Sequence, residues 1–134
     1  GRPTALTPEG VTGYWTVSPD GTTIAATGPD PGITLYAVDG SGPKALPGTA
    51  GNLPLVWINE GLLVGRPGEA VASFGQVYRV DPATGRQTPW RNILPADRTG
   101  IMNFQSLLVT PDGQSEVYSW HRALSNLFIA EGLV

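Results

Sequence analysis

The sequence predicts an all-β protein built from small antiparallel sheets that repeat along the chain. There are 18 glycines and 13 prolines among the 134 residues, and because both residue types interrupt helices, long helices are not expected. Hydrophobic residues form 40% of the chain, which is enough for a packed core. Three segments also share one order of signals: a turn, a short apolar strand, and a second apolar strand that ends in an acidic residue.

The turns are the strongest of these signals. Residues 18–21 read Ser-Pro-Asp-Gly, residues 110–113 read Thr-Pro-Asp-Gly, and residues 58–61 keep only the acidic-Gly ending. Proline presets φ at the second turn position, Asp-Gly accepts the conformations that follow, and apolar residues on both sides indicate a β-hairpin. The turn glycines lie 40 and 52 residues apart. A period near ~40–45 residues with several strands per unit is typical of β-propeller blades.

Each complete repeat is expected to hold four antiparallel strands, and the third repeat is expected to lack its last one. The strands are expected near residues 12–17, 22–27, 33–38, 43–47, 53–58, 62–66, 74–80, 86–91, 102–109, 115–120 and 126–130.

The strand missing from the third repeat is expected at the start of the chain. Residues 3–7 share the pattern Pro-x-Ala-Leu with residues 43–47, the fourth strand of the first repeat. Segment 2–7 is therefore interpreted as a closing strand. The chain is then a single domain, 1–134, a β-propeller fragment of three four-stranded blades. The blades cover about 10–48, 49–93 and 94–134.

Three blades form an open arc, because propellers have 4–8 blades. Its two end faces would be apolar and would favour association. We expect a homodimer in which two copies, related by a two-fold axis, close a six-bladed ring and exchange segment 2–7. The alternative is a chain cut from its natural neighbours that associates in another way.

At these residues the chain resembles the TolB-like β-propeller repeat family. Residues 117–133 are similar to the C-terminus of large bacterial proteins in which such a propeller follows a serine/threonine kinase domain or a winged-helix DNA-binding domain. The resemblance implies the sensing or scaffolding part of a signalling protein, here the last part of a longer propeller. It implies no kinase activity, because the phosphate loop and the catalytic-loop motifs of kinases are absent from the sequence.

No enzyme activity is expected of this chain. His121 is the only histidine, and a Ser-His-Asp relay would need it beside Ser119 or Ser125. It falls where the second and third strands of the third repeat are expected to turn, so we interpret it as a turn residue. The sequence has no cysteine and no Gly-x-Ser-x-Gly motif.

No metal or other cofactor is expected. A single histidine cannot form the usual zinc site. Asp20, Glu60 and Asp112 occupy equivalent turns in different blades, where we expect them to lie apart and to cap their turns rather than to converge on calcium.

Nucleic acid and membrane are not expected partners. The formal charge is −3, and the only basic stretch is thin: Arg86, Arg91 and Arg98 with Trp90 between them. No apolar run reaches the ~18 residues that cross a bilayer, and the chain shows no signal-peptide pattern. The compartment, extracytoplasmic or cytoplasmic in a bacterium, stays open.

The expected function is a non-catalytic sensing module that binds a protein, a peptide or another ligand. In propellers of the resembled kind the first strand of each blade faces the central channel, which points to Tyr14, Asn103 and Gln105. The longer segment 86–101 adds Arg91 and Arg98 as surface candidates. The alternatives are a propeller segment beside a serine peptidase domain, and a structural unit that only assembles with itself.

Overall fold

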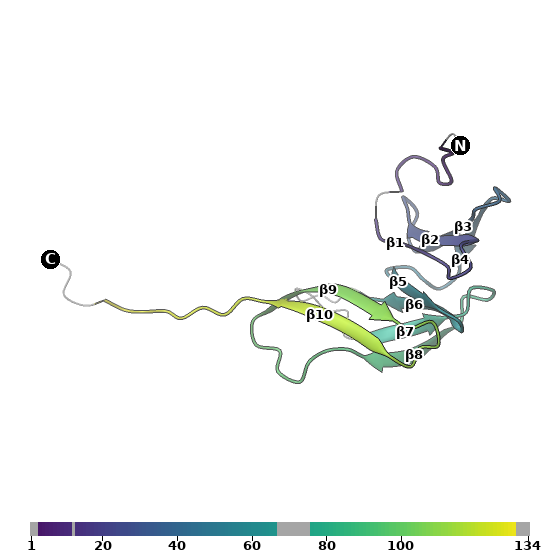
Figure 1. Ribbon diagram of the computed structural model, residues 1–134. Helices are drawn as coiled ribbons and strands as arrows, with labels where there is room; N and C mark the ends of the chain where they lie inside the picture. The colour runs from purple at the N-terminus through teal and green to yellow at the C-terminus, as the bar shows by residue number, and fades with distance from the viewer. Residues whose placement is uncertain (1–2, 12, 67–75, 131–134) are drawn as a thin grey trace.

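The computed structural model describes residues 3–11, 13–66 and 76–130, and within these ranges it contains strands and no helix. The strands form three antiparallel sheets (Figure 1). The all-β prediction is confirmed. The first sheet has the order β1 (Trp15–Val17), β2 (Thr23–Thr27), β3 (Ile33–Ala37), β4 (Pro43–Leu46).

The second sheet repeats this meander. Each strand pairs with the next one along the chain, as the repeat predicts. The third sheet is a two-stranded hairpin in the described part of the chain. The second sheet has the order β5 (Leu53–Ile58), β6 (Gly61–Gly65), β7 (Gln76–Val80), β8 (Gln87–Asn92), and the third pairs β9 (Ile101–Val109) with β10 (Glu116–Arg122).

The core lies on both faces of the second sheet. All five residues of β6 are buried. Because neighbouring side chains of a strand point to opposite faces, Leu62 and Val64 pack against the first sheet with Ile33 and Leu35, whereas Leu63 packs toward the third sheet with Leu107. A continuous apolar strand of this kind is typical of a sheet covered on both sides.

The first strands of the three sheets lie side by side. β5 contacts β1 on one side and β9 on the other. Two hydrogen bonds join the sheets at this seam: Trp57 donates its Nε1–H to the carbonyl of Thr16 (3.4 Å), and the amide of Asn59 donates to the carbonyl of Pro111 (2.7 Å). The inner strands of a propeller have this arrangement. The number of blades and the closure of a ring stay predictions.

The Pro-Asp-Gly turns are held by their aspartates, as expected. Asp20 Oδ1 accepts hydrogen bonds from the Ser18 hydroxyl (2.6 Å) and from the amide and hydroxyl of Thr22 (3.0 and 2.9 Å). These bonds, the Ser18 hydroxyl first, lower the pKa of the Asp20 carboxyl below its usual 3.8. Gly21 has φ 72°, a conformation that suits glycine.

The prediction of a strand at 126–130 is wrong, because these residues lie outside every strand and are exposed. β10 keeps its ladder with β9 through Arg122, which pairs with Ile101, and the amide of Ala123 then donates to the carbonyl of Gly100 (2.8 Å). The chain therefore cannot turn back at 121–123, and it runs away from the sheets as an extended segment (Figure 1). For the same reason His121 lies within β10 and not in a turn.

Residues 3–7 form no strand in the single chain. They lie beside the first sheet, where Thr4, Ala5 and Leu6 line one hollow with Tyr36 and Val38. The closing role expected for segment 2–7 needs a second chain and stays a prediction. Residues 2, 12 and 74–75 of the expected strands lie outside the described residues.

We predict that Thr49→Val lowers the free energy of unfolding by about 1–3 kcal/mol. The Thr49 hydroxyl is buried, accepts the amide of Ile33 (2.9 Å) and donates to the carbonyl of Leu46 (2.6 Å), so valine leaves both groups unpaired in the core. Urea denaturation measures the change. Thr49→Ser keeps the hydroxyl and should lose clearly less; an equal loss in the two variants would contradict this role.

Candidate functional site

The seam between the three sheets contains a pocket of about 240 Å³. Tyr14 and Gln105, two of the residues expected to face a channel, both line it. Its lining also holds residues that the sequence argument did not single out as site residues. The full lining is Tyr14, Trp15, Pro54, Leu55, Phe104, Gln105, Ser106 and Leu107.

A β-bulge shapes the polar side of this pocket. Ser106 pairs with Ser119 and Phe104 pairs with Trp120, so Gln105 between them has no partner across the ladder. Bulges of this kind re-aim a side chain. Gln105 donates its Nε2–H to Oδ1 of Asn103 (2.9 Å), which places the third expected residue next to the pocket. No sequence signal marks this bulge, because it arises from the pairing of two strands.

The chemistry of this inner pocket is aromatic and uncharged. Tyr14 and Trp15 are more than half exposed, and Phe104 meets Trp120 in an edge-to-face contact with ring centroids 5.2 Å apart. None of the lining residues is charged. Exposed aromatic faces beside an amide and a hydroxyl suit a neutral ligand that is held by ring contacts and hydrogen bonds.

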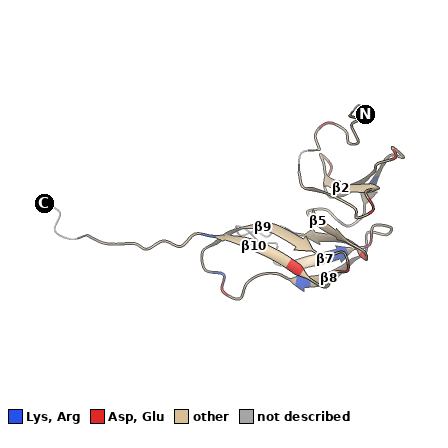
Figure 2. Cartoon of the chain, in the orientation of Figure 1, with Lys and Arg blue, Asp and Glu red and all other residues tan. Residues whose placement is uncertain are grey.

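Arg91 and Arg98 do not line this pocket. The Arg91 guanidinium forms an ion pair with Glu116, donates to the carbonyl of Gly113 (3.2 Å) and lies 4.7 Å from the centre of the Trp90 ring. In Figure 2 a basic segment at one end of β8 lies beside an acidic segment at one end of β10. Arg91 therefore ties the second sheet to the third, whereas Arg98 is exposed in the connection between β8 and β9.

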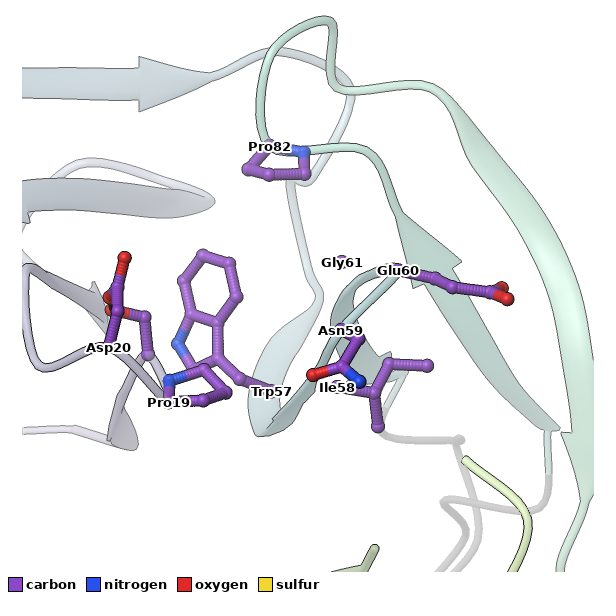
Figure 3. Close-up of a pocket in the computed structure, with 9 residues that line it drawn as sticks. Pro19, Asp20, Trp57, Ile58, Asn59, Glu60, Gly61 and Pro82 are labelled. Atoms are coloured by element: carbon purple, nitrogen blue, oxygen red, sulfur yellow. Dashed lines mark hydrogen bonds between the residues drawn. The ribbon is translucent and has the colours of Figure 1, made fainter. Parts of the chain in front are cut away.

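A second pocket, of about 360 Å³, lies at the turn end of the first two sheets (Figure 3). Asp20 and Glu60 both line it, and the Glu60 side chain points away from Asp20 (Figure 3). Glu60 forms an ion pair with Arg79 instead of capping its turn. The lining consists of Ser18, Pro19, Asp20, Trp57, Ile58, Asn59, Glu60, Gly61 and Pro82.

The acidic side chains do not gather further. Among the described residues no three His, Cys, Asp or Glu side chains come close enough to hold a metal ion. The carboxylate of Asp97 binds Arg122 (3.0 Å) and the amide of Thr99 (2.9 Å), not His121.

The described part of the chain contains no helix long and apolar enough to span a membrane.

Two comparisons with known proteins find no match. No protein-family model matches the chain, and no curated protein gives a significant match. The resemblance to TolB-like propellers therefore stays a prediction that depends on the turn and strand pattern.

We predict that the Asp97 carboxyl titrates with a pKa of about 2, as measured by carboxyl-carbon NMR. The hydrogen bonds from Thr99 contribute most to this lowering and Arg122 contributes next. Because the folded state lowers this pKa, the contribution of Asp97 to stability is present above the usual 3.8 and is lost as the pH falls toward 2.

In Arg122→Gln the pKa of Asp97 should rise but stay below 3.8, because the bonds from Thr99 remain. Arg98→Gln is the matched control and should leave the titration unchanged, since Arg98 does not contribute to the lowering. A wild-type midpoint near 3.8, or equal shifts in both variants, would contradict this assignment.

Proposed function

We propose that this chain is a non-catalytic binding module, a β-propeller fragment that holds a protein or peptide ligand at the seam of its inner strands. The observation that carries the proposal is the pocket between β1, β5 and β9, which is lined by Tyr14, Trp15 and Gln105 among others. Binding sites are concave and mostly apolar, with a few polar groups that orient the ligand. The TolB-like turn pattern supports a place in a larger bacterial signalling protein.

The distribution of exposed apolar residues supports assembly. Among the described residues, the exposed large hydrophobic side chains lie in the first sheet with its N-terminal segment and in the third sheet with its C-terminal segment. The second sheet, which is covered on both faces, has none. Apolar surface gathered at the two ends marks an interaction site. We therefore propose a homodimer in which the end sheets of two copies meet, completing a six-bladed ring.

The partner-facing surface of the third sheet includes Leu108 and Val117. The two residues pair across the ladder, are 67% and 69% exposed, and lie on the face opposite Leu107, which packs on the second sheet. On the first sheet, Val17 pairs with Ile24 and is exposed on the face that points away from the second sheet. In the proposed ring these two faces meet.

We predict that light scattering at micromolar concentration gives a mass twice the 14.1 kDa of one chain. Val117→Arg should give the single-chain mass with an unchanged fold, because the residue is already exposed in one chain and its substitution buries a charge only in the dimer. Ala83→Arg adds the same charge to the exposed turn between β7 and β8 and should remain dimeric. A monomeric wild type would overturn the dimer.

We predict that peptides selected from a random displayed library on the wild-type chain bind Trp15→Ala about tenfold more weakly or worse. The exposed indole supplies contact area to the ligand and little to the fold, so the urea midpoint should hardly move. Lys44→Ala is the control on a remote strand and should bind normally. A purely structural assembly unit would select no peptides, or peptides indifferent to Trp15.

A further inference from the structure

The pocket at the turn end combines a carboxylate from one sheet with an indole from the next. Asp20 comes from the β1–β2 turn, and Trp57 comes from β5 just before the β5–β6 turn. Figure 3 shows the Trp57 ring between Asp20 and Ile58, with Pro19 and Pro82 on either side. None of the lining residues belongs to the inner pocket. The turn pocket is thus a separate site.

The Asp20 carboxylate has one oxygen available. Its Oδ1 accepts all of the hydrogen bonds that hold the turn, from Ser18 and Thr22, and none of the described residues donates to its Oδ2. The carboxyl is ionised at neutral pH, since its usual pKa is 3.8 and these bonds lower the pKa further. A fixed negative charge therefore stands at the rim of the pocket with an unused acceptor.

The other charges near the pocket are already engaged. Glu60 forms an ion pair with Arg79. Lys44 donates its Nζ–H to the carbonyls of Pro82 (3.3 Å) and Ala83 (3.1 Å). Of the two carboxylates in the lining, Asp20 is therefore the one that forms no ion pair with a cation of the described residues.

The remaining lining suits the stem of a long side chain. Pro19, Ile58 and Pro82 are apolar, and Trp57 is 8% exposed at the pocket. Arginine and lysine lay their methylene groups on such surfaces while the charged end reaches an acceptor. A planar guanidinium also donates more than one N–H to a carboxylate and contacts aromatic rings favourably.

We propose that the turn pocket binds a basic side chain of a protein partner, an arginine whose guanidinium donates to Asp20 beside Trp57. The site goes beyond the inner pocket, and its occupancy does not depend on a ligand there. The charge of the chain, −3, favours the approach of such a partner.

The probe for this site is Nα-acetyl-arginine amide, followed through the indole N–H signal of Trp57 in nitrogen–proton NMR spectra. The signal is assigned by its loss in Trp57→Phe. Titration with the probe should shift it along a saturating curve in the millimolar range. Nα-acetyl-citrulline amide has nearly the same shape without the charge and should leave the signal in place.

Two asparagine variants separate binding from turn stability. Asp20→Asn puts an amide donor in place of the free oxygen and should weaken binding about tenfold or more. Asp112→Asn makes the same change in the β9–β10 turn, where Asp112 Oδ1 accepts the Thr110 hydroxyl (2.5 Å) and the Gln114 amide (3.0 Å) outside the pocket. This variant should bind like the wild type.

Three results would overturn the proposal: no shift of the Trp57 signal, equal shifts with the citrulline probe, or equal weakening by the two asparagine variants. None of them bears on the inner pocket, because loss of peptide binding in Trp15→Ala is measured at residues that the turn pocket does not contain.

Discussion

Burial of the second sheet on both faces is the constraint on which the rest of the structure depends. Leu62, Leu63 and Val64 are 0% exposed, and their alternation sends apolar surface toward both neighbours. A sheet with two apolar faces cannot be stable in water alone, since each face needs a cover. Burial of these two apolar faces therefore holds the first and third sheets against the second sheet.

The same constraint explains why function is expected at the seams and ends. A sheet stacked on one neighbour leaves its other face less covered, and here these faces carry the exposed Val17 on one side and Leu108 and Val117 on the other. Stacking also brings the first strands together, so that the hollow between β1, β5 and β9 belongs to no single sheet. A two-fold-related copy would satisfy both uncovered faces at once, which a single further sheet could not do.

Strand positions were predictable because the signals that set them are local. Turn chemistry fixed the hairpins: β5 was expected at 53–58 and occupies Leu53–Ile58, and the Asp20 turn forms the bonds that its residue types favour. The choice of Tyr14 and Gln105 as channel-facing residues followed from the resemblance to propellers, and the two residues line one pocket. These features depend on a few adjacent residues or on the simple repetition of the meander.

What failed depends on pairing between distant residues. The ladder of β9 and β10 continues through Arg122 because Asp97 and Gly100, from the preceding connection, hold the end of β10 in place. The pattern of residues 126–130 favours a strand, yet a strand must pair with the edge of a sheet. The extended ladder directs the chain away from the edge of the third sheet, so residues 126–130 have no strand to pair with there. Contacts for which the sequence carries no local signal, such as the ion pair of Arg91 with Glu116, likewise depend on how the sheets stack.

The turn aspartates show how one side chain can serve both the fold and a ligand. In each Pro-Asp-Gly turn a single carboxylate oxygen accepts the hydrogen bonds of the turn, so the second oxygen takes no part in holding the turn. The next sheet decides whether that oxygen faces a pocket: beside Asp20 the second sheet supplies Trp57 and Pro82, whereas Asp112 does not line this pocket. Stacking of repeated sheets thus gives one copy of a common turn the pocket for which we propose a basic ligand, without any change in the turn itself.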